Sequence, residues 1–532
     1  MRHAPRVLRA LLAAVVALGL AACGGGGSGD TSSGAGSPAA SGPDTLHVLV
    51  GSELKDLEPY LDQIHQKSGV RLVFEYSGTL AGIDRIEHGE PFDGAWFAND
   101  RYFVLGDTQH RIKAQERIML SPVVIGVKRS VASKLGWTHG VSWKQIAERA
   151  GDGSFRFAMT NPTSSNSGFS AVIAVASALA GTPDALRAKD VDSRKLDALY
   201  RGQKLTAGSS GWLLDAYVHD QDRLDGVVNY ESSLLALGKS GRLHEPLTLL
   251  YPSEGIVTAD YPLILLDDAK RPLYDKLVAY LKGDEFQRLV MEKTDRRPVT
   301  PQVKLASEFP TQTVNEIAFP SSLATVDAIL GRYLNQNRVP PHSFYVLDTS
   351  GSMEGDRLDG VKGALGVLAG SDDSLTGRFA RFENREHITL ISFSDSVTPP
   401  VDLTMHSATD AATLGAVKTY AGNLSAGGQT AIYSALEEAI RDAVRARTNE
   451  SPHYDSIVLM TDGENNQGVD QAGFERYYDA LPAADRLKIF PILFGEGDKR
   501  QLESLATLTG GRVFDAKTQA LTDVFKEIRG YQ

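Results

Sequence analysis

The sequence predicts an α/β protein of two successive domains, with mostly parallel sheets that carry helices on both faces. In both halves, short β-rich runs alternate with amphipathic helical stretches, the pattern of strands joined by crossover helices. Some strands of the second half are near-continuous apolar runs, such as residues 344–347 and 457–460, and strands of this kind are buried on both faces. A chain of 532 residues is also too long for one hydrophobic core.

Composition narrows the class of partner. Hydrophobic residues make up 42% of the chain and charged residues 23%, which is ordinary for a soluble globular protein. The formal net charge is −11, whereas proteins that bind nucleic acids usually present a basic face. We therefore expect no nucleic-acid partner.

The first 22 residues have the features of a secretion signal. Three arginines flank or precede an apolar stretch, residues 10–20, that is too short to span a bilayer permanently. Leu20, Ala21 and Ala22 then lead to Cys23, the single cysteine of the chain. This arrangement resembles the lipobox of bacterial lipoproteins, which implies that Cys23 carries lipid and becomes the mature N-terminus. The alternative is an ordinary signal peptide with an incidental cysteine.

Residues 23–44 predict a flexible tether. They are mostly Gly, Ser, Ala and Thr, and such a segment cannot bury enough apolar surface to fold. With one cysteine, the chain cannot form a disulfide within itself. Together these features predict a protein lipid-anchored to the cell membrane on its extracytoplasmic side, with the tether holding the first folded domain off the bilayer.

Residues 45–305 predict the first α/β domain. Its strand candidates are residues 46–50, 71–76, 122–127, 155–159 and 227–230. The order of its motifs resembles the two-lobed extracellular solute-binding proteins of bacterial uptake systems. Gly51-Ser52 follows the first strand, Tyr76-Ser77-Gly78-Thr79 the second, residues 161–168 (NPTSSNSG) precede a helix, and Asn229-Tyr230-Glu231-Ser232 comes late. The resemblance implies a periplasmic-binding-protein-like fold with a cleft between two lobes.

Hydroxyl-bearing residues near the strand ends are the candidate ligand-binding residues of this cleft. Several serines stand just before a helix expected from about residue 168 to residue 180, and a helix start favours an anion or a polar ligand. We expect a small polar or anionic solute to contact Ser52, Ser77, Thr79, Ser164, Ser165, Ser167 and Tyr230. The alternative is that the serines only cap helices and fill turns. Tyr230 and Glu231 either line the cleft or belong to the crossover between lobes.

Residues 306–341 predict a linker. It contains a helical pattern at 321–335 and ends at Pro340-Pro341, because paired prolines end a helix and stiffen the entry to a strand. Residues 342–532 predict the second α/β domain. Its strand candidates are residues 343–347, 387–394, 455–460, 488–494 and 512–514.

Five oxygen-bearing residues of the second domain predict a metal site. The run Asp348-Thr349-Ser350-Gly351-Ser352 follows a buried strand, Thr430 lies in a Gly-rich loop, and Asp462 follows another strand. Hard oxygen donors at the ends of neighbouring strands suit a small hard cation such as Mg²⁺. The alternative is that Asp348 and Ser350 only cap the next helix and Asp462 only begins a turn.

These residues resemble the metal-ion-dependent adhesion site of the von Willebrand factor A (VWA) family. In that family the motif D-x-S-x-S follows the first strand, a Thr lies in a later loop and an Asp follows the fourth strand. Here Asp348, Ser350, Ser352, Thr430 and Asp462 take these places, and the one departure is Gln429 before the Thr, where a Gly is common. The resemblance implies a Rossmann-like domain that binds Mg²⁺, or Mn²⁺ or Ca²⁺, with the aspartates acting largely through water. A partner protein would then offer an acidic side chain to the metal.

Other acids near the motif are expected to form a solvated rim. They are Glu354, Asp356, Asp395 and Glu464.

Two binding functions follow from these expectations. The first is a membrane-anchored binding lipoprotein whose VWA domain holds a protein partner through a divalent metal, beside a solute-binding-like module. The second is the substrate-binding receptor of an ABC-type uptake system, in which the VWA domain serves assembly. We do not expect an enzyme, because the chain has no G-x-S-x-G elbow, no H-E-x-x-H helix and no cysteine nucleophile.

Overall fold

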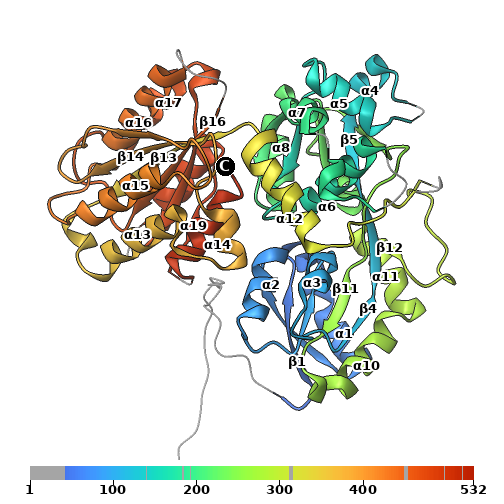
Figure 1. Ribbon diagram of the computed structural model, residues 1–532. Helices are drawn as coiled ribbons and strands as arrows, with labels where there is room; N and C mark the ends of the chain where they lie inside the picture. The colour runs from blue at the N-terminus through green and yellow to red at the C-terminus, as the bar shows by residue number, and fades with distance from the viewer. Residues whose placement is uncertain are drawn as a thin grey trace, which may run out of the picture. The chain divides into compact units, whose positions relative to one another are not determined.

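The computed structural model describes residues 42–532 apart from 139, 182–184, 192, 311–314, 448–452, 496–497 and 518. These residues form three sheets, two in the N-terminal domain and one in the C-terminal domain (Figure 1). Contacts join them into one compact unit. The expected signal peptide (1–22), Cys23 and nearly all of the 23–44 tether lie outside the described residues. Among those that are described, no helix is both long and apolar enough to cross a membrane.

Lobe 1 of the N-terminal domain is built on a five-stranded sheet of order β2-β1-β3-β11-β4. Its strands are β1 (Thr45–Val50), β2 (Arg71–Tyr76), β3 (Gly94–Trp96), β4 (Ala114–Arg117) and β11 (Pro262–Leu265). The first three are parallel, whereas β11 is antiparallel to β3 and β4. Its helices are α1 (Leu61–Ser68), α2 (Thr79–Glu87), α3 (Arg101–Gly106), α10 (Arg271–Leu281) and α11 (Asp284–Thr294).

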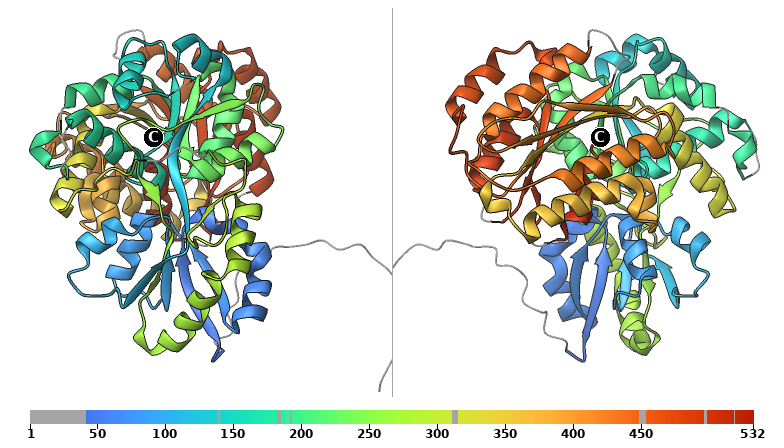
Figure 2. Two further views of the ribbon diagram at one scale, coloured as in Figure 1. Left: turned by 90° about the vertical axis from the view of Figure 1, so that its right-hand side faces the viewer. Right: turned by 60° about the vertical axis from the view of Figure 1, so that its left-hand side comes forward.

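Lobe 2 carries a seven-stranded sheet in which β8 lies between β5 and β6. Its strands are β5 (Met119–Lys128), β6 (Phe157–Thr160), β7 (Gln203–Ala207), β8 (Gly226–Tyr230), β9 (Leu247–Leu250), β10 (Thr258–Ala259) and β12 (Arg297–Pro298). Its helices are α4 (Arg129–Leu135), α5 (Trp143–Gly151), α6 (Asn166–Ala180), α7 (Ser193–Arg201), α8 (Ser210–Asp220) and α9 (Glu231–Lys239). Only Ile118 separates β4 from β5, so this nearly continuous strand path runs from one lobe into the other (Figure 2).

The segment between the domains contains the helix α12 (Leu323–Arg332), which continues into a π-helical turn, Tyr333–Asn337. It packs against the N-terminal domain instead of standing free. Asp327 accepts a hydrogen bond of 2.8 Å from the Tyr102 hydroxyl, and Arg332 donates one of 2.8 Å to the carbonyl of Ala188.

The C-terminal domain has a six-stranded sheet of order β15-β14-β13-β16-β17-β18. Its strands are β13 (Pro341–Asp348), β14 (His387–Phe393), β15 (Val401–Thr404), β16 (Tyr454–Thr461), β17 (Lys488–Leu493) and β18 (Phe514–Asp515). All neighbours are parallel except β15, which is antiparallel to β14.

Helices cover both faces of this sheet (Figure 1). Alternate residues of β13 serve the two faces: Tyr345 and Leu347 belong to one apolar cluster, Phe344 and Val346 to the other. The first cluster includes residues of α13 (Asp356–Gly366), α15 (Ala411–Asn423) and α19 (Leu521–Arg529), and the second residues of α16 (Ile432–Arg447), α17 (Gln471–Ala480) and α18 (Lys499–Thr509). A short helix, α14 (Leu375–Ala380), follows α13. The predicted fold class, a two-lobed domain followed by a Rossmann-like domain with a mostly parallel sheet, is confirmed.

Candidate functional site

The five expected metal ligands meet at the carboxyl ends of the central strands. Asp348 ends β13, and Asp462 directly follows β16, its parallel neighbour. Two backbone hydrogen bonds join the loop before Thr430 to the D-x-S-x-S run: Gly427 N–H to the Thr349 carbonyl, 2.8 Å, and Gly351 N–H to the Gly428 carbonyl, 3.0 Å. Ligands that are distant in the chain are thus brought to one edge of the sheet.

Hydrogen bonds fix the orientation of the two carboxylates. Asp348 Oδ1 accepts from the Ser350 N–H at 2.7 Å and its Oδ2 from the Thr461 hydroxyl at 2.6 Å. The Ser352 hydroxyl donates to Asp462 Oδ1 at 2.7 Å and lies 3.1 Å from the Ser350 hydroxyl. Oriented side chains of this kind form a site that needs little rearrangement to accept a ligand.

Gly463 leaves room above these groups. A Cβ placed on it would lie 3.7 Å from the Thr430 hydroxyl and 3.8 Å from the Ser352 hydroxyl, so both hydroxyls face the same space. Thr430 itself is held by its N–H, which donates to the Asn466 side chain at 2.8 Å.

Buried negative charge is in excess at this edge. Asp348 and Asp462 are 0% and 2% exposed. Burial, with the nearby Asp462 charge adding to it, raises the pKa of the Asp348 carboxyl. Arg357 donates to Asp462 Oδ2, but its side chain is one-third exposed (34%). The pair of buried carboxylates thus has one partly solvated guanidinium, which contacts Asp462.

The donor chemistry fits a divalent cation. The set contains two carboxylates and three neutral hydroxyls, all oxygen, as Mg²⁺ prefers. Within the described part of the chain, no group of three or more His, Cys, Asp or Glu side chains is placed to hold a metal. Three of the five donors are therefore hydroxyls. Because a hydroxyl carries no charge, it binds a cation without reducing the positive charge of that cation.

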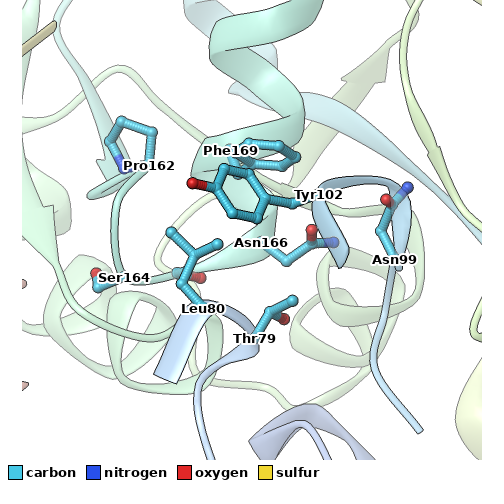
Figure 3. Close-up of a pocket in the computed structure, with 9 residues that line it drawn as sticks. Thr79, Leu80, Asn99, Tyr102, Pro162, Ser164, Asn166 and Phe169 are labelled. Carbon is cyan, nitrogen blue, oxygen red and sulfur yellow. The ribbon is translucent and has the colours of Figure 1, made fainter. Parts of the chain in front are cut away.

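The N-terminal domain has a small pocket between its lobes. Lobe 1 contributes Thr79, Leu80, Asn99 and Tyr102, and lobe 2 contributes Pro162, Ser164, Ser165, Asn166 and Phe169. Figure 3 shows the rings of Tyr102 and Phe169 side by side; their centroids are 6.2 Å apart. The lobes approach closely here, since a Cβ on Gly78 would lie 3.1 Å from the Ser164 carbonyl oxygen. The lining is apolar and polar, with no charged side chain.

The expected ligand-binding residues fall into three groups. Thr79, Ser164 and Ser165 line the pocket. Ser167 and Tyr230 are buried behind it. Ser52, which is exposed, and Ser77, which is half-buried, do not line it.

The serines at the start of α6 bond to one another, and Ser165 does not act as a simple cap. The helix begins at Asn166, two residues earlier than expected, and the Ser165 side chain makes no capping hydrogen bond. Ser167 instead shares hydrogen bonds with Thr160 at 2.9 Å and Ser210 at 2.8 Å, and Ser165 lies 3.2 Å from Ser210. This buried hydroxyl network sets the position of the pocket wall.

Two further polar residues lie next to the pocket, and the sequence patterns did not point to them. Asn99 lines the pocket, and its Nδ2 is buried without a hydrogen-bond partner. Asp100, beside it, has a buried Oδ2 without a partner, and burial together with the Asp260 charge raises the pKa of Asp100 to about 6. Buried polar atoms are normally paired, so these two atoms point to a polar ligand or water. In the sequence, these two residues are indicated weakly, by an Asn-Asp pair after a short apolar strand.

Glu231, the first residue of α9, is bonded within lobe 2. It is fully buried and accepts two hydrogen bonds of 2.6 Å from Arg297 of β12, and another from the Tyr251 hydroxyl. Tyr230 beside it accepts a bond of 3.2 Å from Asn166 Nδ2. The two residues therefore differ: Tyr230 contacts a pocket residue, and Glu231 ties α9 to β12.

Comparisons with known families match the two domains that carry these candidate sites. Residues 46–293 match the model of the family described as bacterial extracellular solute-binding proteins. Residues 344–527 match the model of the von Willebrand factor type A domain. The chain carries a solute-binding-like domain and a VWA domain. No curated protein matches the chain.

Solved structures similar to this chain include members of both kinds. The periplasmic binding protein AfuA from Actinobacillus pleuropneumoniae, with fructose-6-phosphate bound, is 13% identical over 55% of this chain and 97% of its own, with a TM-score of 0.43. The sulfate-binding protein SubI from Mycobacterium tuberculosis is 16% identical over 53% and 96%, with a TM-score of 0.37. A von Willebrand factor type A structure from Catenulispora acidiphila is 17% identical over 36% and 43%, with a TM-score of 0.29.

The VWA domain has supporting residues that the motif alone did not reveal. Arg357 pairs with Asp462, and Asp395 accepts a hydrogen bond of 2.8 Å from the Gln429 N–H. Asp395 thus shapes the Thr430 loop in addition to its place on the rim. The loop turns at Gly428, whose φ of 84° and closeness to the Asp395 carboxylate both exclude a side chain. In the sequence, Gly428 was the feature that could have indicated this turn.

Proposed function

We propose that the chain is a membrane-anchored extracytoplasmic binding protein, not an enzyme, whose VWA domain holds a protein partner through a divalent cation. The observation that carries this proposal is the convergence of five oxygen donors, two buried carboxylates and three hydroxyls. The solute-binding-like domain beside it takes a small polar or anionic solute. Lipidation of Cys23, which would anchor the chain, is part of the same proposal.

The residues of the VWA domain have distinct roles in this scheme. Ser350, Ser352 and Thr430 would give neutral oxygens to the cation, and Asp348 and Asp462 would act on it largely through bound water, which leaves the ion electrophilic. Mg²⁺ keeps several waters, so when bound it supplies an electrophilic position that a carboxylate from the partner can take. Ser352 is exposed, which leaves the site open on the side from which a partner would approach.

A second candidate function is that of substrate-binding receptor in an ABC-type uptake system, with the VWA domain serving assembly. The pocket between the lobes supports it. Its lining is uncharged and it lies at the start of α6, where free backbone N–H groups favour a small anion or polar group. A specific solute that raises the melting temperature (Tm) of the full chain would favour this function.

The metal proposal is tested by thermal unfolding of the full chain with Mg²⁺ and with EDTA. At a Mg²⁺ concentration of about 100 times its Kd, binding stabilises the folded state by about 2.7 kcal/mol and Tm rises. Asp348→Ala should lose this rise completely. Asp356→Asn, an exposed rim acid on the same side, is the matched control and should keep it.

The partner is tested by capture from cell envelopes. We expect recovery on the wild-type chain in Mg²⁺ and its loss with EDTA or with Asp348→Ala. Equal recovery in EDTA would refute metal-dependent partner binding, and an unchanged Tm in Mg²⁺ would refute the metal site itself.

A further inference from the structure

The VWA domain contacts lobe 1 of the solute-binding-like domain through one carboxylate. Asp84, in the middle of α2, accepts from the Leu375 N–H at 3.0 Å and from the Thr376 N–H at 3.3 Å. It also accepts from the Thr376 hydroxyl at 2.6 Å. Leu375 and Thr376 begin α14, and the Leu375 side chain is buried in the apolar cluster of the N-terminal domain. Asp84 is 7% exposed, so the contact is largely shielded from water.

The contact with lobe 2 is of another kind, because it is mainly aromatic. Tyr531, next to the C-terminal residue, packs edge-to-face on Trp212 of α8 with ring centroids 4.9 Å apart. Gly208 lets this ring approach, since a Cβ there would overlap it. Asn161 donates a hydrogen bond of 3.4 Å to the Arg529 carbonyl, and Lys488 pairs with Asp220 at 3.0 Å.

The same two segments that hold the VWA domain also line the pocket. Helix α2 begins with Thr79 and Leu80, both pocket residues, one turn before Asp84. In lobe 2, the loop from Asn161 supplies Pro162 and Ser164 to the pocket. A Cβ on Gly530 would lie 2.7 Å from the Ser164 hydroxyl, so the C-terminus of the VWA domain directly backs the pocket wall.

We propose that the VWA domain is a clasp across the two lobes, in which the bonds from α14 to Asp84 hold lobe 1 in its closed position. The aromatic contact keeps the VWA domain on lobe 2, whereas one carboxylate and the apolar side chains of Leu375 and Phe379 hold lobe 1. Lobe 1 therefore separates first when the cleft opens. Closure of the cleft and docking of α14 stabilise each other, and linkage makes this coupling reciprocal. A solute in the cleft then strengthens the contact of the VWA domain with lobe 1.

The test is amide hydrogen exchange of the full chain, without added solute. Asp84→Ala removes the acceptor of three hydrogen bonds. We expect exchange to accelerate about tenfold or more in three segments, since one lost charged hydrogen-bonding group has an effect of that order. The segments are 79–87, 161–169 and 375–380. Glu90→Ala is the matched control, because Glu90 is an acid of the same lobe that pairs with Arg85 of α2 instead of with α14.

Thr376→Val, which removes only a hydroxyl, should give a smaller change in the same three segments and serves if Asp84→Ala does not fold. Acceleration confined to 375–380 would show a local contact and overturn the clasp. An equal response of 161–169 to Glu90→Ala would overturn it too, since it would reflect only a weakened α2. The measurement uses neither metal nor solute, so its result tests the clasp separately from the proposed function.

Discussion

Both ends of the VWA sheet bury charged side chains, but the balance of positive and negative charge differs between them. At the amino end, Glu386 before β14 accepts hydrogen bonds from Arg338 and from Arg529, the latter at 2.6 and 2.7 Å. At the carboxyl end, Asp462 pairs with the partly exposed Arg357, and Asp348 is buried near Asp462. One end thus has two guanidiniums for one carboxylate, and the other has two carboxylates for one guanidinium.

The amino end nevertheless needs no ligand. Its three side chains are between 1% and 4% exposed, and backbone carbonyls take the remaining guanidinium hydrogens. Arg338 Nε donates to the Leu334 carbonyl at 3.1 Å, and Arg529 Nε to the Ala380 carbonyl at 2.8 Å. At the carboxyl end the serine and threonine hydroxyls carry no charge, so the negative charge of the two aspartates stays in excess. Buried guanidiniums that share a carboxylate and bond to backbone carbonyls indicate a stabilising cluster, whereas buried carboxylates in excess indicate a site for a cation.

The largest expected effect is a loss of stability when the charge pairing at the amino end is removed. Glu386→Ala leaves two buried guanidiniums without their carboxylate, which should lower the free energy of unfolding by about 3–5 kcal/mol. Asp462→Asn, measured in EDTA, should change it by less than about 1 kcal/mol, since it relieves repulsion while losing the bond from Arg357. Urea unfolding of the full chain measures both. Equal losses would mean that the two ends do not differ.

The second expected effect is an opposite response to acid. Beside the amino end lie the rings of His342, His387 and His453, with His342 and His387 centroids 5.5 Å apart. Burial, then the neighbouring histidines and Arg447, lower the pKa of His342 to about 3. Because the unfolded chain binds this proton near pH ~6.5, the stability that neutral His342 contributes falls below that pH, by about 1.4 kcal/mol per pH unit until about pH 3.

Asp348 has the opposite sign. Its pKa is raised by burial, so its charge destabilises the fold at neutral pH, and this cost is relieved as the pH falls towards the pKa of the unfolded chain. We expect His342→Gln to flatten the loss of stability between about pH 6.5 and 4, and Asp348→Asn, in EDTA, to make it steeper. Urea midpoints at a series of pH values from neutral down to about pH 4 measure the slopes. The exposed His406→Gln is the control, and an unchanged slope in His342→Gln would contradict the assignment.

The difference between the ends also explains what the sequence could predict. Among the expected metal donors, D-x-S-x-S and Asp462 come at the ends of strands, and parallel strands bring their carboxyl ends together, so these could be placed from the sequence. Thr430 lies in the loop before α16, and the resemblance to the VWA family pointed to it. The amino-end triad could not. Arg338, Glu386 and Arg529 are distant in sequence and carry no motif, and many other arginines and glutamates offer the same pairing.

The pocket between the lobes could be predicted from the sequence in part. Helix starts pointed to Thr79, Ser164 and Ser165, which line it. Asn99 and Tyr102 reach the pocket because β3 and α3 pack beside β1, and β3 has only three residues, too few for a periodic pattern. The antiparallel strand β11 joins lobe 1 from a distant part of the chain, and nothing local predicts its partner.

The smallest expected effect is a change in Mg²⁺ affinity when Arg357 is removed from the carboxyl end. If Arg357 partly neutralises Asp462, then Arg357→Ala should increase the affinity for Mg²⁺, because a cation no longer competes for that carboxylate. Exposed ion pairs contribute up to about 1 kcal/mol, so the gain should stay below about tenfold in Kd. Isothermal titration of the full chain with Mg²⁺ measures it, and Lys134→Gln, an exposed cation of the solute-binding-like domain, controls for net charge. A weaker affinity in Arg357→Ala would instead show that Arg357 orients Asp462 for the metal, and that this end of the sheet, like the other, depends on a guanidinium to complete it.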